Sequence, residues 1–215
     1  MNNSVSDPLI VLSKKLNLYG NFLILLIGNI SNIVKILFFL QFPLRSKSCS
    51  YYILAGTFAD LFFINNRPLI SLLRQLNLIK PMSSFECPIR SYFQTLSFSL
   101  SFIFLVLAAF DRYCFTSREY TRRKLSNPHT ASRLIFICTL TYIIFNIHHL
   151  FRNKLHNGIC TTRYSHANLR PFILTFFCTI PLVLFILNVL TIMNIRSMHH
   201  PLHSKVNVQW VLLCI

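Results

Sequence analysis

The sequence predicts an all-α membrane protein with five transmembrane helices. Hydrophobic residues make up 53% of the 215 residues, whereas charged residues make up only 12%. A soluble domain carries about 25% charged residues, so this chain has too few to cover a globule in water. Long apolar segments follow one another along the chain, each near the roughly 20 helical residues that cross a bilayer. They lie at about 16–44, 51–73, 91–115, 134–151 and 171–195.

The residues before the first segment, MNNSVSDPLIVLSKK, do not resemble a cleavable signal peptide, because the basic residues follow the short apolar stretch. We therefore expect the first helix to act as its own insertion signal. The sequon Asn2-Asn3-Ser4 fits an N-terminus on the outer side of the membrane. An odd number of crossings then places the C-terminus inside.

The net charge of +16 is spread over the loops. Basic residues lie between apolar segments, which indicates membrane topology and not a nucleic-acid-binding stripe. The two sides of the membrane receive nearly equal numbers of them, so charge alone does not fix the orientation. The tightest cluster, REYTRRK at 118–124, favours an inner position for its loop.

Polar side chains lie at similar depth in the first three segments. Asp60 is near the middle of the second, where a carboxylate costs about 2.5–3.5 kcal/mol. Asn29 in the first segment and Ser101 in the third can join it in a polar cluster. Two interpretations stay open at this point. Asp60 is either neutral and hydrogen-bonded to Asn29, or it helps to bind a hard monovalent cation, for which Na⁺ is the first candidate.

The third segment places two cysteines on one side of the membrane. Cys87 lies roughly 37 Å along the helix axis from Arg112, at a rise of 1.5 Å per residue. That length is close to the full bilayer thickness of about 40–45 Å, so the two residues lie at opposite boundaries. Cys160, between the fourth and fifth segments, lies on the side of Cys87. If that side is oxidising, the two thiols can pair and stabilise the fold by roughly 4 kcal/mol.

Taken together, these residues resemble the rhodopsin-like (class A) G-protein-coupled receptors. The matched positions, in chain order, are Gly28-Asn29, FADL with Asp60, Cys87, Ser101, Asp111-Arg112-Tyr113, Cys160 and Pro181. The resemblance covers residues 1–215 as one receptor domain and reaches only the first five helices of the family's seven-helix receptor bundle. It implies a multi-pass plasma-membrane protein with an extracellular N-terminus and a kink in helix five at Pro181.

The resemblance also implies the partners: an extracellular ligand and a heterotrimeric G protein. Asp111, Arg112 and Tyr113 then form the G-protein switch. In this family the Asp and the Arg pair with each other in the resting receptor, and the freed Arg helps to accept the C-terminal helix of the G protein. The ion pair is therefore expected between Asp111 and Arg112.

Some positions depart from the family's pattern. The fourth segment, ASRLIFICTLTYIIFNIHHL, lacks the usual Trp, and Val189 replaces a Tyr that supports the active state. Gln94 lies at the depth of the ligand pocket where amine receptors place an Asp, so we expect a peptide-like or anionic ligand and not an amine. Asn65, Asn66 and Arg67 lie where they can line the same pocket.

The last residues, HSKVNVQWVLLCI, resemble the inner beginning of a sixth helix and are too few to cross a bilayer. Helices six and seven carry the family's movable segments and half of its ion pocket. We therefore expect this polypeptide alone not to activate a G protein. The alternative within the family is a truncated, non-signalling form that acts on full-length receptors.

Two other function classes share single features with this sequence. His148-His149 and His199-His200-Pro201-Leu202-His203 are similar to the histidine boxes of di-iron desaturases, but the fifth segment places them on opposite sides of the membrane. We therefore expect no enzyme, and no cofactor other than the Na⁺ ion. A small transporter or channel subunit would use Asp60 as a cation relay. That class commonly shows repeated halves and Gly-broken helices, while this chain has four Gly and no visible repeat.

Overall fold

The computed structural model describes residues 8–41, 44–79, 83–156, 159–162 and 166–198. The elements are α1 (Pro8–Leu40), the 3-10 turn η1 (Leu44–Ser46), α2 (Ser48–Ile64), the π-helical turn η2 (Asn65–Leu69), α3 (Ile70–Gln75), α4 (Glu86–Phe115), α5 (Tyr120–Leu125), α6 (Pro128–Asn146), α7 (His148–Arg152), β1 (Asn153–His156), β2 (Ile159–Thr162) and α8 (His166–Met198). The prediction of an all-helical membrane fold is confirmed, with one short hairpin added.

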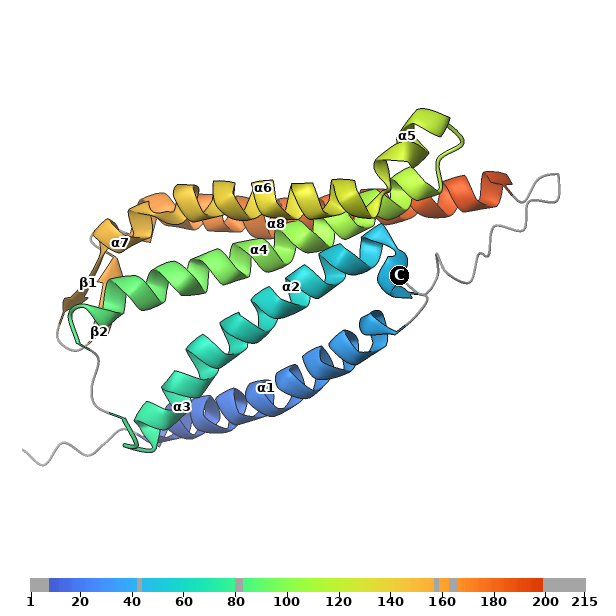
Figure 1. Ribbon diagram of the computed structural model, residues 1–215. Helices are drawn as coiled ribbons and strands as arrows, with labels where there is room; N and C mark the ends of the chain where they lie inside the picture. The colour runs from blue at the N-terminus through green and yellow to red at the C-terminus, as the bar shows by residue number, and fades with distance from the viewer. Residues whose placement is uncertain (1–7, 42–43, 80–82, 157–158, 163–165, 199–215) are drawn as a thin grey trace, which may run out of the picture.

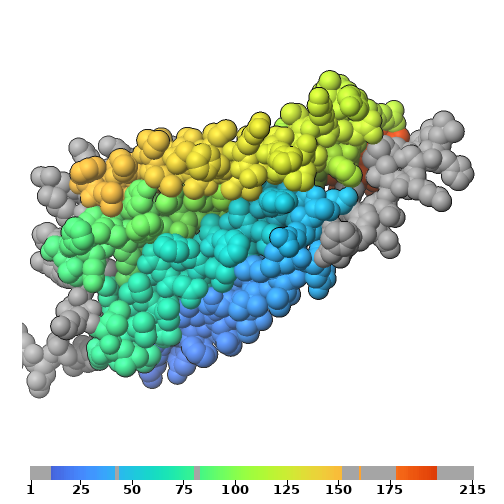
Figure 2. Space-filling model, in the orientation of Figure 1, coloured from blue at the N-terminus to red at the C-terminus, as the bar shows by residue number. Residues whose placement is uncertain are grey.

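The long helices lie side by side with α4 at the centre (Figure 1). α4 packs against α2, α6 and α8, while α1 packs against α2 and α3. In the space-filling view, α1, α2, α4 and α6 follow one another across one face (Figure 2). η1 and α5 lie at one end of the bundle, called here the α5 end. α3, α7 and the β1–β2 hairpin lie at the other, called the hairpin end.

Four helices of the described part are long and apolar enough to cross a membrane. They are Val11–Leu40, Glu86–Phe115, Pro128–Phe151 and Cys178–Ser197. The second predicted segment, 51–73, runs instead through α2, η2 and α3, none of which has that length alone. The chain is nonetheless helical without a break from Ser48 to Gln75, with the π turn inside the helix.

Pro68 accounts for the π turn. Proline has no N–H and its ring clashes with the carbonyl one turn earlier, so the helix widens at this point into the π turn. The guanidinium group of Arg90 on α4 donates from Nη2 to the carbonyls of Asn66 and Arg67, at 3.1 and 3.2 Å. These bonds give polar groups inside the widened turn a partner from a neighbouring helix.

The buried core follows one stripe of α4. Tyr92, Leu96, Leu100 and Phe104 recur every fourth residue and form one cluster. Ala108 continues the stripe into a second cluster toward the α5 end, which also holds Phe39, Cys49, Tyr52 and Ala131. Large apolar side chains are exposed along α1, α6 and α8, as surfaces that face lipid require.

Candidate functional site

Asp111, in the last turns of α4, is the centre of a polar network at the α5 end. Its side chain is buried, with 7% exposed. Ser48, the first residue of α2, lies 2.8 Å from both carboxylate oxygens and donates to them. The hydroxyl of Ser126, just after α5, lies 2.9 Å from that of Ser48. Because Ser48 has one hydroxyl proton, which it gives to Asp111, Ser126 donates to Ser48. The network joins α2, α4 and α5.

The expected ion pair between Asp111 and Arg112 is not formed among the described residues, and this expectation is corrected. Arg112 instead donates from Nε to the Sγ atom of Cys49, at 3.5 Å. Successive residues of a helix point about 100° apart, so the two side chains diverge. The carboxylate already accepts the single hydroxyl proton of Ser48. The role of the two residues in a G-protein switch stays a prediction.

Tyr113 ties the α5 segment to α4. Its hydroxyl accepts a hydrogen bond of 2.6 Å from Nη1 of Arg122, whose guanidinium carbon lies 5.9 Å from the ring centroid. Arg122 also pairs with Glu119, with 2.7 Å between Nε and Oε2. Arg118 donates to the backbone carbonyl of Ser197 near the end of α8. The α5 segment is thus held against two long helices.

Two of the three residues of the predicted mid-membrane cluster are in contact. Ser101 on α4 donates to Oδ1 of Asp60 on α2. Asn29 bonds elsewhere, since its Oδ1 accepts from Nδ2 of Asn65 at 3.0 Å and its Nδ2 donates to the carbonyl of Leu25. A hydrogen bond between Asp60 and Asn29, one of the two interpretations left open, is therefore not formed in the described structure. Asn65, more than a helical turn beyond Asp60, is the residue that meets Asn29.

Asp60 and Ser101 supply a carboxylate and a hydroxyl, which are the oxygen ligands that hard cations prefer. Two ligands do not complete a coordination shell. No group of three or more His, Cys, Asp or Glu side chains able to bind a metal lies within the described segments. The sodium site at Asp60 stays a prediction.

Gly56, which sequence reasoning missed, brings α2 and α4 together at this level. A Cβ atom built there would lie 3.6 Å from Cβ of Phe104 and 3.8 Å from the carbonyl oxygen of Ser101. Gly56 lies one helical turn before Asp60, so both face α4. The missing side chain lets the two backbones approach, and Asp60 then reaches Ser101. The spacing of four residues between Gly56 and Asp60, which places both on one face of the helix, could have pointed to Gly56.

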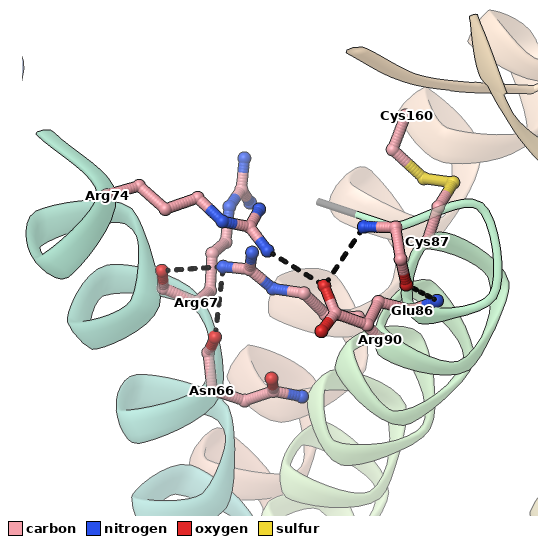
Figure 3. Close-up of polar contacts among 8 residues, drawn as sticks. Asn66, Arg67, Arg74, Glu86, Cys87, Arg90 and Cys160 are labelled. Carbon is pink, nitrogen blue, oxygen red and sulfur yellow. Dashed lines mark hydrogen bonds and ion pairs between the residues drawn. A yellow bond between two sulfur atoms is a disulfide. The ribbon is translucent and has the colours of Figure 1, made fainter. Parts of the chain in front are cut away.

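At the hairpin end the structure contains the predicted disulfide between Cys87 and Cys160. Their Cα atoms lie 5.6 Å apart, and 73 positions separate them in the sequence. Cys87 is fully buried at the start of α4, and Cys160 lies in β2 opposite Leu155 of β1. The bond holds the hairpin against the start of α4 (Figure 3).

Three arginines gather beside this disulfide, from η2, α3 and α4 (Figure 3). They are Arg67, Arg74 and Arg90. Arg74 forms an ion pair with Glu86, with 3.4 Å between Nη2 and Oε2. Glu86 and Ser83 also bond each other's backbone N–H, both at 3.2 Å, and so cap the start of α4. Of the three, only Arg67 was named from the sequence as a candidate site residue. Arg74 and Arg90 lie on other elements, and their distance from Arg67 in space cannot be read from the sequence.

The remaining predicted residues lie apart from these groups. Gln94 is half-buried on α4, one turn from Arg90 toward the membrane centre. Pro181 lies inside α8, which is helical on both sides of it, and the kink there stays a prediction. Val189 is exposed on the same helix. His148 lies at the hairpin end with His149, while 199–203 fall outside the described residues.

Comparison with known proteins and protein families gives one match. A family model described as "7 transmembrane receptor (rhodopsin family)" matches residues 31–209 of the 215-residue chain. No curated protein matches the chain. The matched region contains the Asp111 network, the Asp60–Ser101 pair, both cysteines of the disulfide and the three arginines.

Proposed function

This chain belongs to the rhodopsin family of seven-transmembrane receptors, and we propose that it binds an extracellular ligand and signals to a heterotrimeric G protein through the α5 end. The observation that carries the proposal is the buried Ser48–Asp111 contact beside Arg112. Receptors of this family are multi-pass membrane proteins and not enzymes. The histidine-box interpretation is therefore set aside.

The proposed orientation places the hairpin end outside the cell, at the plasma membrane. A disulfide persists on the oxidising side of a membrane, which supports an outer position for Cys87 and Cys160. Basic residues near membrane helices favour the cytoplasmic side, which supports an inner position for Arg122, Arg123 and Lys124 of α5.

In the proposed mechanism, Ser48 and Ser126 hold the end of α4 against α2 and α5 in the resting receptor. A hydrogen bond to a charged group contributes about 1.5–3 kcal/mol, which is the size of a two-state conformational preference. Among the described residues Arg112 bonds to a thiol, which is a weak acceptor, so its other donors can serve a G protein. Breaking the Ser48–Asp111 contact frees the α4 end for that partner.

A peptide-like ligand suits the outer half of the bundle better than an amine. Gln94 offers no carboxylate to an ammonium group. At the hairpin end, Arg67, Arg74 and Arg90 lie around the carboxylate of Glu86, and together they would repel a cation.

The proposal predicts binding of purified, nucleotide-free G protein to sealed inside-out plasma-membrane vesicles and no binding to right-side-out vesicles. The vesicles carry the product of the complete gene, so that any residues encoded after Ile215 are present. Arg112→Ala is expected to weaken binding about tenfold, because it removes charge-assisted hydrogen bonds. The matched control is Arg133→Ala, an exposed arginine of α6. Equal binding by wild type and Arg112→Ala, or binding on the outer side, would contradict the proposal.

A further inference from the structure

We propose that Arg67, Arg74 and Arg90 form a binding site for a carboxylate group of the extracellular ligand. This inference rests on the proposed function in one respect, namely that the hairpin end faces outside. It specifies the class of ligand as an acid, such as a peptide with a free C-terminal carboxylate or an acidic side chain.

The charge of the arginine cluster favours an anion. The three guanidinium groups converge from both sides of the space between η2–α3 and α4 (Figure 3). Arg67 and Arg74 repel the positive charge of Arg90. The carboxylate of Glu86 compensates for one of the three charges. An incoming anion would relieve the remaining repulsion, and this part of the bundle is only half-buried, so the anion can enter from the water.

Several N–H donors of the cluster are fixed in place or lack a hydrogen-bond partner in the described structure. Arg90 is held in place by the two carbonyls of η2, at 3.1 and 3.2 Å. Nε of Arg74 is buried and has no hydrogen-bond partner in the described structure. Among the residues that the structure describes, the exposed side chain of Arg67 makes no ion pair. A guanidinium group presents five N–H donors in a planar fork that matches a carboxylate, so donors for the ligand are already positioned.

The cluster already binds one carboxylate, that of Glu86. Oε2 of Glu86 lies 3.4 Å from Arg74, longer than the roughly 2.7–2.9 Å of a strong charge-assisted hydrogen bond. The side chain of Glu86 is 59% exposed, which weakens the pair further. Glu86 also has a second function as the helix cap with Ser83. A ligand carboxylate that uses the fork of two arginines can therefore displace it.

The test uses succinate as the probe and the product of the complete gene in phosphatidylcholine nanodiscs. The thermal unfolding midpoint is measured against succinate concentration, with chloride at matched ionic strength as the reference. We expect a saturable rise for the wild type, because a ligand that binds the folded state stabilises it. Arg67→Gln is expected to weaken apparent succinate binding about tenfold, or about 1.4 kcal/mol. The matched control Arg133→Gln is expected to bind as the wild type does.

Glu86→Gln is an independent variant that is expected to have the opposite effect on succinate binding. The amide keeps the helix cap but removes the internal competing charge, so succinate should bind more tightly than to the wild type. The inference is overturned if the wild type shows no saturable rise, if Arg67→Gln binds as Arg133→Gln does, or if Glu86→Gln weakens binding.

A second arm replaces phosphatidylcholine with phosphatidylglycerol. If the anionic lipid raises the midpoint through Arg67 while succinate has no effect, the site binds a lipid headgroup and the ligand proposal is wrong. Failure of G-protein binding with intact succinate binding would contradict the proposed signalling function alone. Loss of succinate binding with intact G-protein binding would contradict this inference alone.

Discussion

Cys87→Ala is expected to lower the free energy of unfolding by about 4 kcal/mol, the largest loss of stability that we predict. The Cys87–Cys160 bond joins residues 73 positions apart, and in the chain-entropy model a loop of that size gives an effect of this order. Without it, the hairpin is no longer held against the start of α4. The measurement is thermal unfolding of the purified protein in nanodiscs, converted to free energy.

The controls for this prediction use the other cysteines. Cys160→Ala should cost about as much as Cys87→Ala, and the double variant should cost no more than either, because all three remove one bond. Cys178→Ala changes an exposed free thiol on α8 and is expected to leave the midpoint unchanged. Equal midpoints for Cys87→Ala and Cys178→Ala would show that the disulfide does not stabilise the bundle.

Gly56→Leu is expected to lower the free energy of unfolding by about 1–3 kcal/mol, because it overpacks the contact between α2 and α4. The Cβ atom of the new side chain would already be in van der Waals contact with Cβ of Phe104, at 3.6 Å, and with the carbonyl oxygen of Ser101, at 3.8 Å. The remaining atoms of a leucine find these positions occupied, so the helices must separate. That separation also pulls Asp60 away from Ser101. The unfolding midpoint measures the effect.

Two glycine variants make this test specific. Gly56→Ala adds only the atom that fits at ordinary contact distance, and it should cost little. Gly20→Leu introduces the same leucine on α1 where nothing lies within 4 Å, and it should be tolerated. If Gly56→Leu and Gly20→Leu unfold at the same temperature, the close approach of α2 and α4 does not support the bundle.

The sequence predicts the membrane helices well, because apolar length is a local property of each segment. Depth along a helix also placed Cys87 and Cys160 on one side correctly, since the rise per residue is constant. The same reasoning did not indicate the π turn at Pro68, which lies inside a segment that is helical as expected. It also gave no sign of the β1–β2 hairpin, whose strands of four residues are too short for a periodic pattern.

Side-chain partners were harder to predict than depth. Asn29 was placed beside Asp60, but its partner is Asn65, because the rotation of α1 against α2 decides which residues meet. Asp111 was expected to pair with its neighbour in sequence and bonds instead to Ser48, 63 positions earlier. The arginine cluster joins three elements, so no single stretch of sequence indicates it.

The central claim is that the Ser48–Asp111 contact holds the receptor at rest, and its most direct test is basal nucleotide exchange on a purified G protein. Ser48→Ala, in the product of the complete gene, is expected to raise the basal rate about tenfold, because it removes a hydrogen bond to a charged group. The matched control is Ser50→Ala, a buried serine of α2 that bonds the Leu44 carbonyl and not Asp111. A rate for Ser48→Ala equal to or below that of the wild type, at equal amounts of folded receptor, would contradict the account.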